Sequence, residues 1–322
     1  MTTLHAPAAA RAATSPLMRR DFWRGVWRVS DPKITLASVA SMVLGAALAA
    51  TAGPLHWGWL ALTVAGIFAI EAAKNASGEI VDWDSGTDQA VADEDRSPFS
   101  GGKRVLVDRL MTRGETALVA LIFYAVGGAI GMAIVWYREP WVLGLGLAGA
   151  ALAFFYHAPP LRLSYRGLGE AAVALTYGPI IACGTYLVQR HELDLAVVLT
   201  SIPLGLEIAA FLWINEFPDR RADAAAGKRT LVVRLGARRA ADGFAVLVGV
   251  AFAGLAALPL LGVSPGVLGG LIGLPLAIAA ARRLRRDPET TREIVPAQAW
   301  TLLSFLLMAI GVAAGLGVAA LL

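Results

Sequence analysis

The sequence has few charged residues and almost no sulfur that could cross-link it or bind a metal. Only 16% of its 322 residues are charged, while 57% are apolar and the mean hydropathy is +0.62. A typical soluble domain carries about 25% charged residues. A single cysteine, Cys183, excludes an internal disulfide and a thiolate metal cluster. The amino-terminal residues lack an apolar core followed by a cleavage site, so no secretory signal is expected. This composition indicates that lipid is the solvent.

Nine continuous apolar segments are long enough, or nearly so, to cross a hydrocarbon core about 30 Å thick. Backbone groups inside lipid must bond within their own segment, so each segment is expected to be a helix. Continuous runs, rather than alternating ones, disfavour a β-barrel. We therefore predict an all-α polytopic transmembrane helix bundle over residues 34–322. The expected spans are Ile34–Ala52, Leu55–Ala73, Thr116–Tyr137, Trp141–Tyr156, Leu168–Val188, Leu195–Ile214, Phe244–Leu261, Pro265–Ala281 and Gln298–Leu321.

Residues 1–33 are expected to form a separate cytoplasmic arm, disordered in its first part. Its last part, Arg19–Lys33, is basic and contains Phe22, Trp23 and Trp27. Basic residues combined with aromatic rings are typical of an amphipathic helix lying at the membrane interface.

The basic residues predict the orientation of the bundle. If the amino terminus is cytoplasmic, all of the 28 Lys and Arg residues except Arg138 and Arg190 lie on the inner side. This asymmetry matches the positive-inside rule. It also accounts for a pI near 9.5 without nucleic acid as a partner. We expect an integral protein of a bacterial inner membrane, with the long inner loops in the cytoplasm.

Two groups of acidic residues continue the inner ends of the second and sixth segments. Asn215, Asp219 and Asp223 are spaced four residues apart, which places three oxygen-bearing side chains on one helical face. The spacing of Asn75, Glu79 and Asp82 does the same at the other end. One such group is as easily explained by solvation or pairing with Arg, but two on the same side favour a shared function.

These oxygen ligands suit Mg²⁺ bound together with a phosphate-bearing substrate. Basic residues follow each group, Lys103 after the first and Lys228 with Arg229 after the second. Carboxylates for a metal and cations for oxyanions together favour diphosphate chemistry. Two acidic motifs facing each other suggest an allylic diphosphate, and a membrane enzyme suits such a substrate. Loss of its diphosphate leaves a carbocation that aromatic rings can stabilise. Asp88 is a further candidate ligand, or a residue that caps a loop.

A secondary transporter is the alternative from another functional class. Many spans and intramembrane acids suit a transporter, but transporters place their sites near the midplane. Here the acidic residues gather at the inner ends of the segments.

The second acidic motif and the residues after it resemble the UbiA superfamily of intramembrane aromatic prenyltransferases. The run Asn215-x3-Asp219-x3-Asp223 is followed by Gly227-Lys228-Arg229-Thr230-Leu231, similar to the family's second aspartate motif. The resemblance implies nine transmembrane helices around a central cavity capped by cytoplasmic loop helices, with Mg²⁺ as cofactor. It also implies a prenyl diphosphate donor and an aromatic acceptor.

Two stretches look most like 1,4-dihydroxy-2-naphthoate prenyltransferases of menaquinone synthesis. They are 156–170, which begins Tyr156-His157-Ala158-Pro159-Pro160, and Arg96–Gly102. Another quinone precursor, a tetrapyrrole or a glycerol-phosphate lipid stay open as acceptors, and the sequence does not give the oligomeric state.

The first motif departs from the family pattern, Asn-Asp-x2-Asp-x3-Asp. In one register Asn75 is followed by Ala76, and Glu79 takes the next acidic place. In the other, Ser85–Asp88 fixes the alignment, so that Asp82 is acidic and Gly78 stands where Asn is usual. Both registers supply hard oxygen ligands.

The resemblance extends the set of candidate site residues. Asp219, Asp223, Glu79 and Asp82 are expected to be catalytic through the metal, and Lys103, Lys228 and Arg229 to bind diphosphate. Arg96 and Arg162 are candidates for diphosphate or acceptor. Tyr156 and Tyr165 are expected to face the carbocation or position the acceptor, unless they only anchor the protein at the interface.

Overall fold

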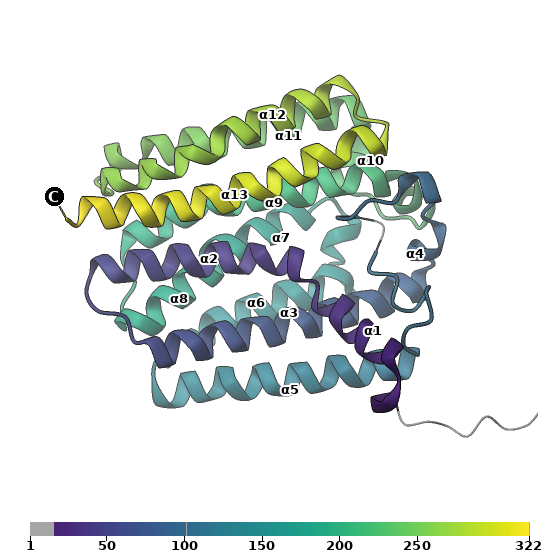
Figure 1. Cartoon of the computed structure of the whole chain (residues 1–322), viewed down its shortest axis with the longest axis horizontal. Coiled ribbons are helices and arrows are strands. Elements are labelled where there is room, and N and C mark those ends of the chain that lie inside the picture. Colours follow the sequence, from purple (N-terminus) through teal and green to yellow (C-terminus); the bar gives the residue numbers. More distant parts are fainter. Residues whose placement is uncertain (1–15, 101, 322) are drawn as a thin grey trace, which may run out of the picture.

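The computed structural model describes residues 16–100 and 102–321, and every regular element in those ranges is helical (Figure 1). This confirms the predicted all-α class. The α-helices are α1 Arg20–Ser30, α2 Pro32–Thr51, α3 Trp57–Ser85, α4 Thr87–Ala90, α5 Arg113–Tyr137, α6 Val142–His157, α7 Gly169–Leu175, α8 Ile181–Arg190, α9 Leu195–Ala225, α10 Leu231–Leu235, α11 Ala237–Ala257, α12 Leu274–Arg286 and α13 Thr291–Ala319. Shorter 3-10 segments are η1 Pro16–Met18, η2 Asp93–Asp95, η3 Leu163–Tyr165, η5 Leu258–Leu261 and η6 Pro265–Gly273, and a π turn, η4, covers Thr176–Ile180.

The long helices run side by side along the long axis of the molecule (Figure 1). Helix α13 packs against η6, α12, α2 and α9, and α3 packs mainly against α5. The short elements α1, α4 and α10 gather at the end opposite the carboxyl terminus. One end of the bundle therefore carries most of the irregular chain.

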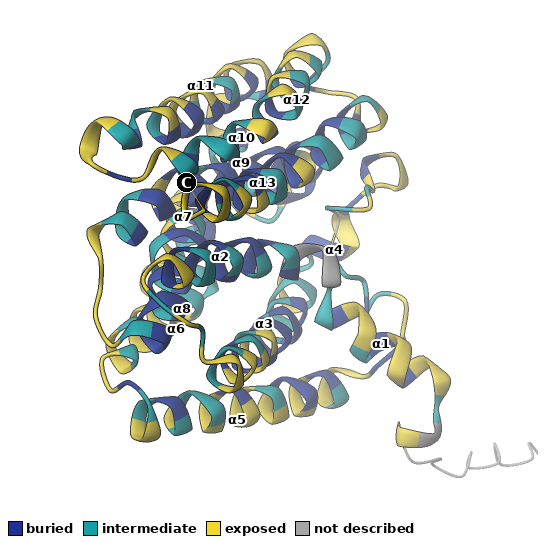
Figure 2. Ribbon diagram, turned by 60° about the vertical axis from the view of Figure 1, so that its left-hand side comes forward, coloured by how far each residue is buried: buried dark blue, intermediate teal, exposed yellow. Residues whose placement is uncertain are grey.

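Each of the nine predicted spans falls on a helix. Within the described residues, seven helices are long and apolar enough to cross a membrane. The α1–α2 pair, bent by 47°, gives an eighth if it counts as one span, and α6 has only 16 residues. Exposed apolar residues run along the outer face of α5, as expected for a surface in lipid (Figure 2). The structure thus supports seven or eight spans, and nine around a central cavity stays a prediction.

Close helix packing depends on small residues, as lipid-embedded bundles require. A Cβ atom added to Gly269 in η6 would collide with the carbonyl oxygen of Gly311 in α13. The two backbones therefore touch without intervening side chains.

Helices α3 and α9 continue well beyond the predicted spans and carry the acidic motifs with them. Helix α3 is followed by its C-cap residue Gly86, whose φ of 79° is the left-handed conformation typical of this position. Helix α9 is preceded by its N-cap residue Asp194, whose side chain accepts a hydrogen bond from the Ala196 amide at 2.7 Å. Residues 75–82 and 215–223 thus lie within helices, as the spacing of the two acidic groups predicted.

Helix α1 lies within the predicted interfacial stretch Arg19–Lys33. It buries Phe22, Gly25 and Val29 and exposes Trp23 and Trp27. The predicted disorder of the arm concerns residues 1–15, which lie outside the described residues. The boundary at residue 33 and the placement of α1 at a membrane surface stay predictions.

Candidate active site

The two acidic motifs meet around one lysine at the end of the bundle that carries α4 and α10. The Nζ atom of Lys228 lies 3.5 Å from Oδ1 of Asp82 on α3 and 3.4 Å from Oδ1 of Asp223 on α9. Asp219, one turn earlier on α9, is close enough for its charge to act on Lys228. Helix ends far apart in sequence thus share one cation.

Lys228 reaches this position because the chain turns sharply after α9. Gly227 has a φ of +73°, and the Lys228 amide donates to the Asp223 carbonyl at 2.8 Å. A glycine adopts this left-handed conformation without steric cost. The turn therefore directs the lysine back over the last turn of α9.

Asp88 joins the cluster from α4, directly after the Gly86 cap. Its side chain is 4% exposed and lies against the Cα of Gly102, where a Cβ would overlap the carboxylate. Gly102 also has a φ of +74°. The loop before Lys103 can thus approach Asp88 this closely only through a glycine.

Negative charge dominates this cluster. Burial and the neighbouring carboxylates of Asp82 and Glu79 raise the pKa of Asp88 to about 8. Burial disfavours the charge of Lys228, but the Asp82 and Asp223 carboxylates outweigh this effect and raise the pKa of its ammonium group. Additional positive charge would therefore be stabilised here.

The cluster fits Mg²⁺ bound jointly with a diphosphate. Oδ1 of Asp82 and Oδ2 of Asp88 are buried and make no hydrogen bond. Across residues 16–100 and 102–321, no three His, Cys, Asp or Glu side chains converge closely enough to hold a metal by themselves. Protein sites for Mg²⁺ commonly use one or two carboxylates and complete the coordination with substrate phosphates and water.

The other predicted ligands have protein partners or lie apart. Oε1 of Glu79 accepts the Leu106 amide at 2.8 Å, so this carboxylate also anchors the loop. Oδ1 of Asn215 accepts Nε2 of Gln298 from α13 at 3.0 Å. Asn75 is buried on α3 and its Nδ2 makes no hydrogen bond. Asp82, Asp88, Asp219 and Asp223 are therefore the ligand candidates grouped around Lys228.

Of the predicted substrate-binding residues, one group lies near Lys228. The Arg162 guanidinium lies 4.0 Å from the centre of the Tyr165 ring, and Lys228 lies 6.0 Å from it. Tyr156 is close enough to Lys228 for the ammonium charge to act on its hydroxyl group. These four side chains belong to one region.

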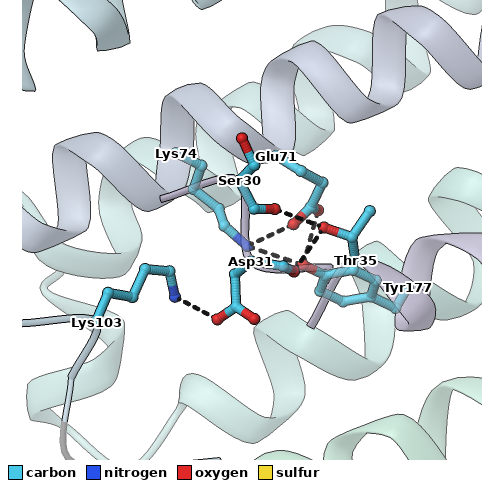
Figure 3. Close-up of polar contacts among 7 residues, drawn as sticks. All are labelled: Ser30, Asp31, Thr35, Glu71, Lys74, Lys103 and Tyr177. Atoms are coloured by element: carbon cyan, nitrogen blue, oxygen red, sulfur yellow. Dashed lines mark hydrogen bonds and ion pairs between the residues drawn. The ribbon is translucent and has the colours of Figure 1, made fainter. Parts of the chain in front are cut away.

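The other three predicted cations have different surroundings. Lys103, which follows Gly102, is close enough for its charge to act on Glu79 and Asp88. Lys103 is paired with Asp31 at 3.0 Å (Figure 3). The exposed Arg96 pairs with Asp93. The side chain of Arg229 is exposed, and its amide donates to the Tyr165 carbonyl at 3.2 Å.

Sequence reasoning missed a polar cluster deeper in the bundle, formed by Glu71, Lys74 and Tyr177 (Figure 3). A lysine and a glutamate three residues apart in an apolar segment were a visible signal, because ionisable groups within spans are commonly functional. Tyr177 had no such signal, since its contact with α3 is a tertiary one. Glu216 was also missed; it lies against Glu170 from α7.

The sequence is similar to proteins of one known family. A family model described as the UbiA prenyltransferase family matches residues 38–303. A 1,4-dihydroxy-2-naphthoate octaprenyltransferase of Mycobacterium tuberculosis is 29% identical over 285 residues, covering 88% of this chain and 94% of that protein. A 2-carboxy-1,4-naphthoquinone phytyltransferase of Synechocystis is 29% identical over 231 residues, covering 70% and 69%.

Solved structures show the same fold. A UbiA homolog from Archaeoglobus fulgidus, bound to GPP and Mg²⁺, superposes with a TM-score of 0.62 at 16% identity, covering 90% of this chain and 99% of that one. A UbiA homolog from Aeropyrum pernix gives a TM-score of 0.65 at 17% identity, with 86% and 96% covered. Because the family model spans most of the sequence, this chain belongs to the UbiA prenyltransferase family and is a prenyltransferase.

Proposed function

We propose that the protein transfers a polyprenyl group from an allylic prenyl diphosphate to 1,4-dihydroxy-2-naphthoate, with Mg²⁺ as cofactor. The observation that carries this proposal is that Asp82 and Asp223, from the two acidic motifs, both lie within 3.5 Å of the Lys228 ammonium group, while Asp88 is close enough to interact with its charge. Relatives named for naphthoate prenylation support the acceptor. A structural neighbour bound to GPP and Mg²⁺ supports the donor and the metal.

The chemistry follows from the charges at the site. Breaking the C1–O bond of the donor leaves a diphosphate and an allylic carbocation, and a ring carbon of the acceptor then forms the new C–C bond to C1. With a dihydroxynaphthoate, CO₂ leaves and the ring regains its aromaticity. Bound Mg²⁺ would supply positive charge for the leaving diphosphate.

The side chains of this chain have separate tasks in that reaction. Lys228 would contact the diphosphate oxygens, because its ammonium group is the buried cation between the two motifs. The rings of Tyr156 and Tyr165 would stabilise the allylic cation through their faces. Asp82, Asp88, Asp219 and Asp223 would hold the metal. Arg162, stacked on Tyr165, would orient that ring.

The proposal includes a bacterial inner membrane with the site on the cytoplasmic side. The supporting observation is that the basic residues concentrate at this end of the chain's spans, as the positive-inside rule requires.

The test uses the purified full chain in lipid nanodiscs with Mg²⁺, a long-chain prenyl diphosphate and 1,4-dihydroxy-2-naphthoate. We expect release of diphosphate and a prenylated, decarboxylated product by mass spectrometry, both abolished by EDTA. A product that forms equally well in EDTA contradicts the metal role. Vesicle uptake without any prenylated product from any acceptor would instead support a transporter.

A further inference from the structure

A polar triad, in which Glu71 and Tyr177 are buried and Lys74 is half-buried, links α3 to the π turn η4 (Figure 3). The Tyr177 hydroxyl donates to Oε1 of Glu71 at 2.7 Å, and Nζ of Lys74 donates to Tyr177 Oη at 2.8 Å. Lys74 also lies 3.2 Å from Oε2 of Glu71. All three residues belong to predicted membrane-spanning helices, where charged groups are costly and usually have a function.

The fold holds this triad in one geometry. Glu71 and Lys74 are one turn apart on α3, and Tyr177 projects from the turn at which the α7–α8 helix widens. Ser41 of α2 donates its hydroxyl to the backbone carbonyl of Tyr177. The phenol is therefore fixed by contacts from two neighbouring helices.

Lys74 faces the candidate active site from a deeper level. Its spacing from Gly78 and Asp82 places it on the same side of α3 as both residues. A Cβ atom added to Gly78 would lie 3.8 Å from Nε2 of His157, so this face of α3 is directed towards His157. The Lys74 charge also reaches Tyr156 and His157. The Cα atom of Lys74 lies about 12 Å along the helix axis from that of Asp82, taking 1.5 Å for each of eight residues.

The ammonium group retains donor capacity. It has three N–H groups, and the hydrogen bonds found among the described residues use one for Glu71 and one for Tyr177. The Lys74 side chain is 33% exposed, whereas that of Glu71 is 7% exposed. Lys74 is thus the accessible member of the triad, and Glu71 is the buried one that fixes its position.

A purely structural link between two helices does not need these groups. Apolar residues of similar volume replace buried ion pairs with little loss of stability, and often with a gain. A lysine held by a carboxylate and a phenol, with one N–H left over, suits an anionic ligand better than it suits packing.

We propose that Lys74, held by Glu71 and Tyr177, binds an oxyanion of the aromatic acceptor and so orients its ring beneath the prenyl diphosphate. This inference rests on the proposed function and adds a specificity-determining residue to it. The oxyanion is either the ring carboxylate or a ring oxygen, and the two are separated by the choice of acceptor.

The decisive variant is Glu71→Gln/Lys74→Met, which removes both charges and leaves neither unpaired. In nanodiscs, the KM for 1,4-dihydroxy-2-naphthoate is expected to rise at least tenfold, while the KM for prenyl diphosphate stays within twofold. The single variant Glu71→Gln keeps an oxygen that can accept from Lys74 and Tyr177, so Lys74 stays in place, but it removes the competing negative charge and is therefore expected to lower the acceptor KM. If the single variant does not fold, the double variant decides.

The same assays with 1,4-dihydroxynaphthalene, which has no carboxylate, identify the group. If the double variant raises KM only for the carboxylated acceptor, Lys74 binds the carboxylate. If it raises KM equally for both acceptors, Lys74 binds a ring oxygen. The matched control is Arg285→Met/Asp242→Asn, which removes an exposed ion pair at 2.7 Å and should change neither KM.

Two results would overturn the inference. One is an unchanged acceptor KM in the double variant. The other is an increase in acceptor KM for Glu71→Gln that matches the double variant, because that would show a structural triad. A wild-type protein that prenylates no acceptor refutes the proposed function instead, so the two failures are distinguishable.

Discussion

Replacing Lys228 with Met tests the charge balance of the site most directly. The lysine side chain is 14% exposed and its Nζ lies 3.4–3.5 Å from two carboxylate oxygens. At an effective dielectric constant near 20, each pair has a Coulomb energy of about 4.7 kcal/mol before desolvation is counted. Removing one partner of such a buried group typically costs about 3–5 kcal/mol, because the remaining charges lose their compensation.

The variant should therefore change metal binding and donor binding in opposite directions. Without the ammonium group, Asp82 and Asp223 are free to share a cation, so Mn²⁺ or Mg²⁺ should bind at least tenfold more tightly in the absence of diphosphate. The diphosphate loses a charge-assisted contact of about 1.5–3 kcal/mol, so kcat/KM for the donor should fall about 10–150-fold.

Titration with Mn²⁺ followed by electron paramagnetic resonance measures the first effect, and diphosphate release measures the second. The matched control, Arg239→Met, removes an exposed cation from α11 and should change neither quantity. Weaker metal binding in Lys228→Met would show that the lysine does not compete with a metal for Asp82 and Asp223. An unaltered kcat/KM would show that it does not bind the diphosphate.

Three further perturbations probe the site and the bundle. Asp223→Asn should lower kcat at least a hundredfold, which is the scale expected for losing one electrostatic stabiliser, while circular dichroism stays unchanged; retained turnover would remove this carboxylate from the reaction. Gly102→Ala should raise the Mg²⁺ concentration needed for half-maximal activity, because the left-handed backbone costs about 1–2 kcal/mol and the new Cβ displaces Asp88; an identical Mg²⁺ requirement would contradict the close contact. Gly269→Val should destabilise the bundle by about 1–3 kcal/mol, seen as a lower Tm in detergent, because its side chain meets the backbone of Gly311; an unchanged Tm would mean that the two helices can separate.

Helical periodicity and hydropathy were sufficient to predict the architecture. Each apolar segment became a helix, and the acidic residues after the second and sixth segments lie on helical extensions of those segments. These features are local, because they depend on spacing within one stretch of chain. The widened turn at Thr176–Ile180 was not predicted, since the sequence around Gly178-Pro179 reads as one continuous span.

The positions of candidate site residues could be predicted only where they depend on spacing within one helix. Asp219 and Asp223 follow from the helix period, but the partner of Asn215 lies on α13, 83 residues away. In the same way, Glu79 is held by the amide of Leu106, and no pattern within α3 indicates that contact. Such assignments depend on tertiary packing, which hydropathy does not encode.

The length of α3 and α9 links the active site mechanically to the bilayer. With 29 and 31 residues, these helices are about 44 and 47 Å long, against a hydrocarbon core of about 30 Å. Each is a single continuous helix, with one part in a candidate membrane span and the other end carrying carboxylates of the candidate active site. Spanning helices adjust to membrane thickness by tilting. A change in lipid chain length would therefore alter the separation of Asp82 and Asp223, and turnover should vary with the thickness of the membrane around the enzyme.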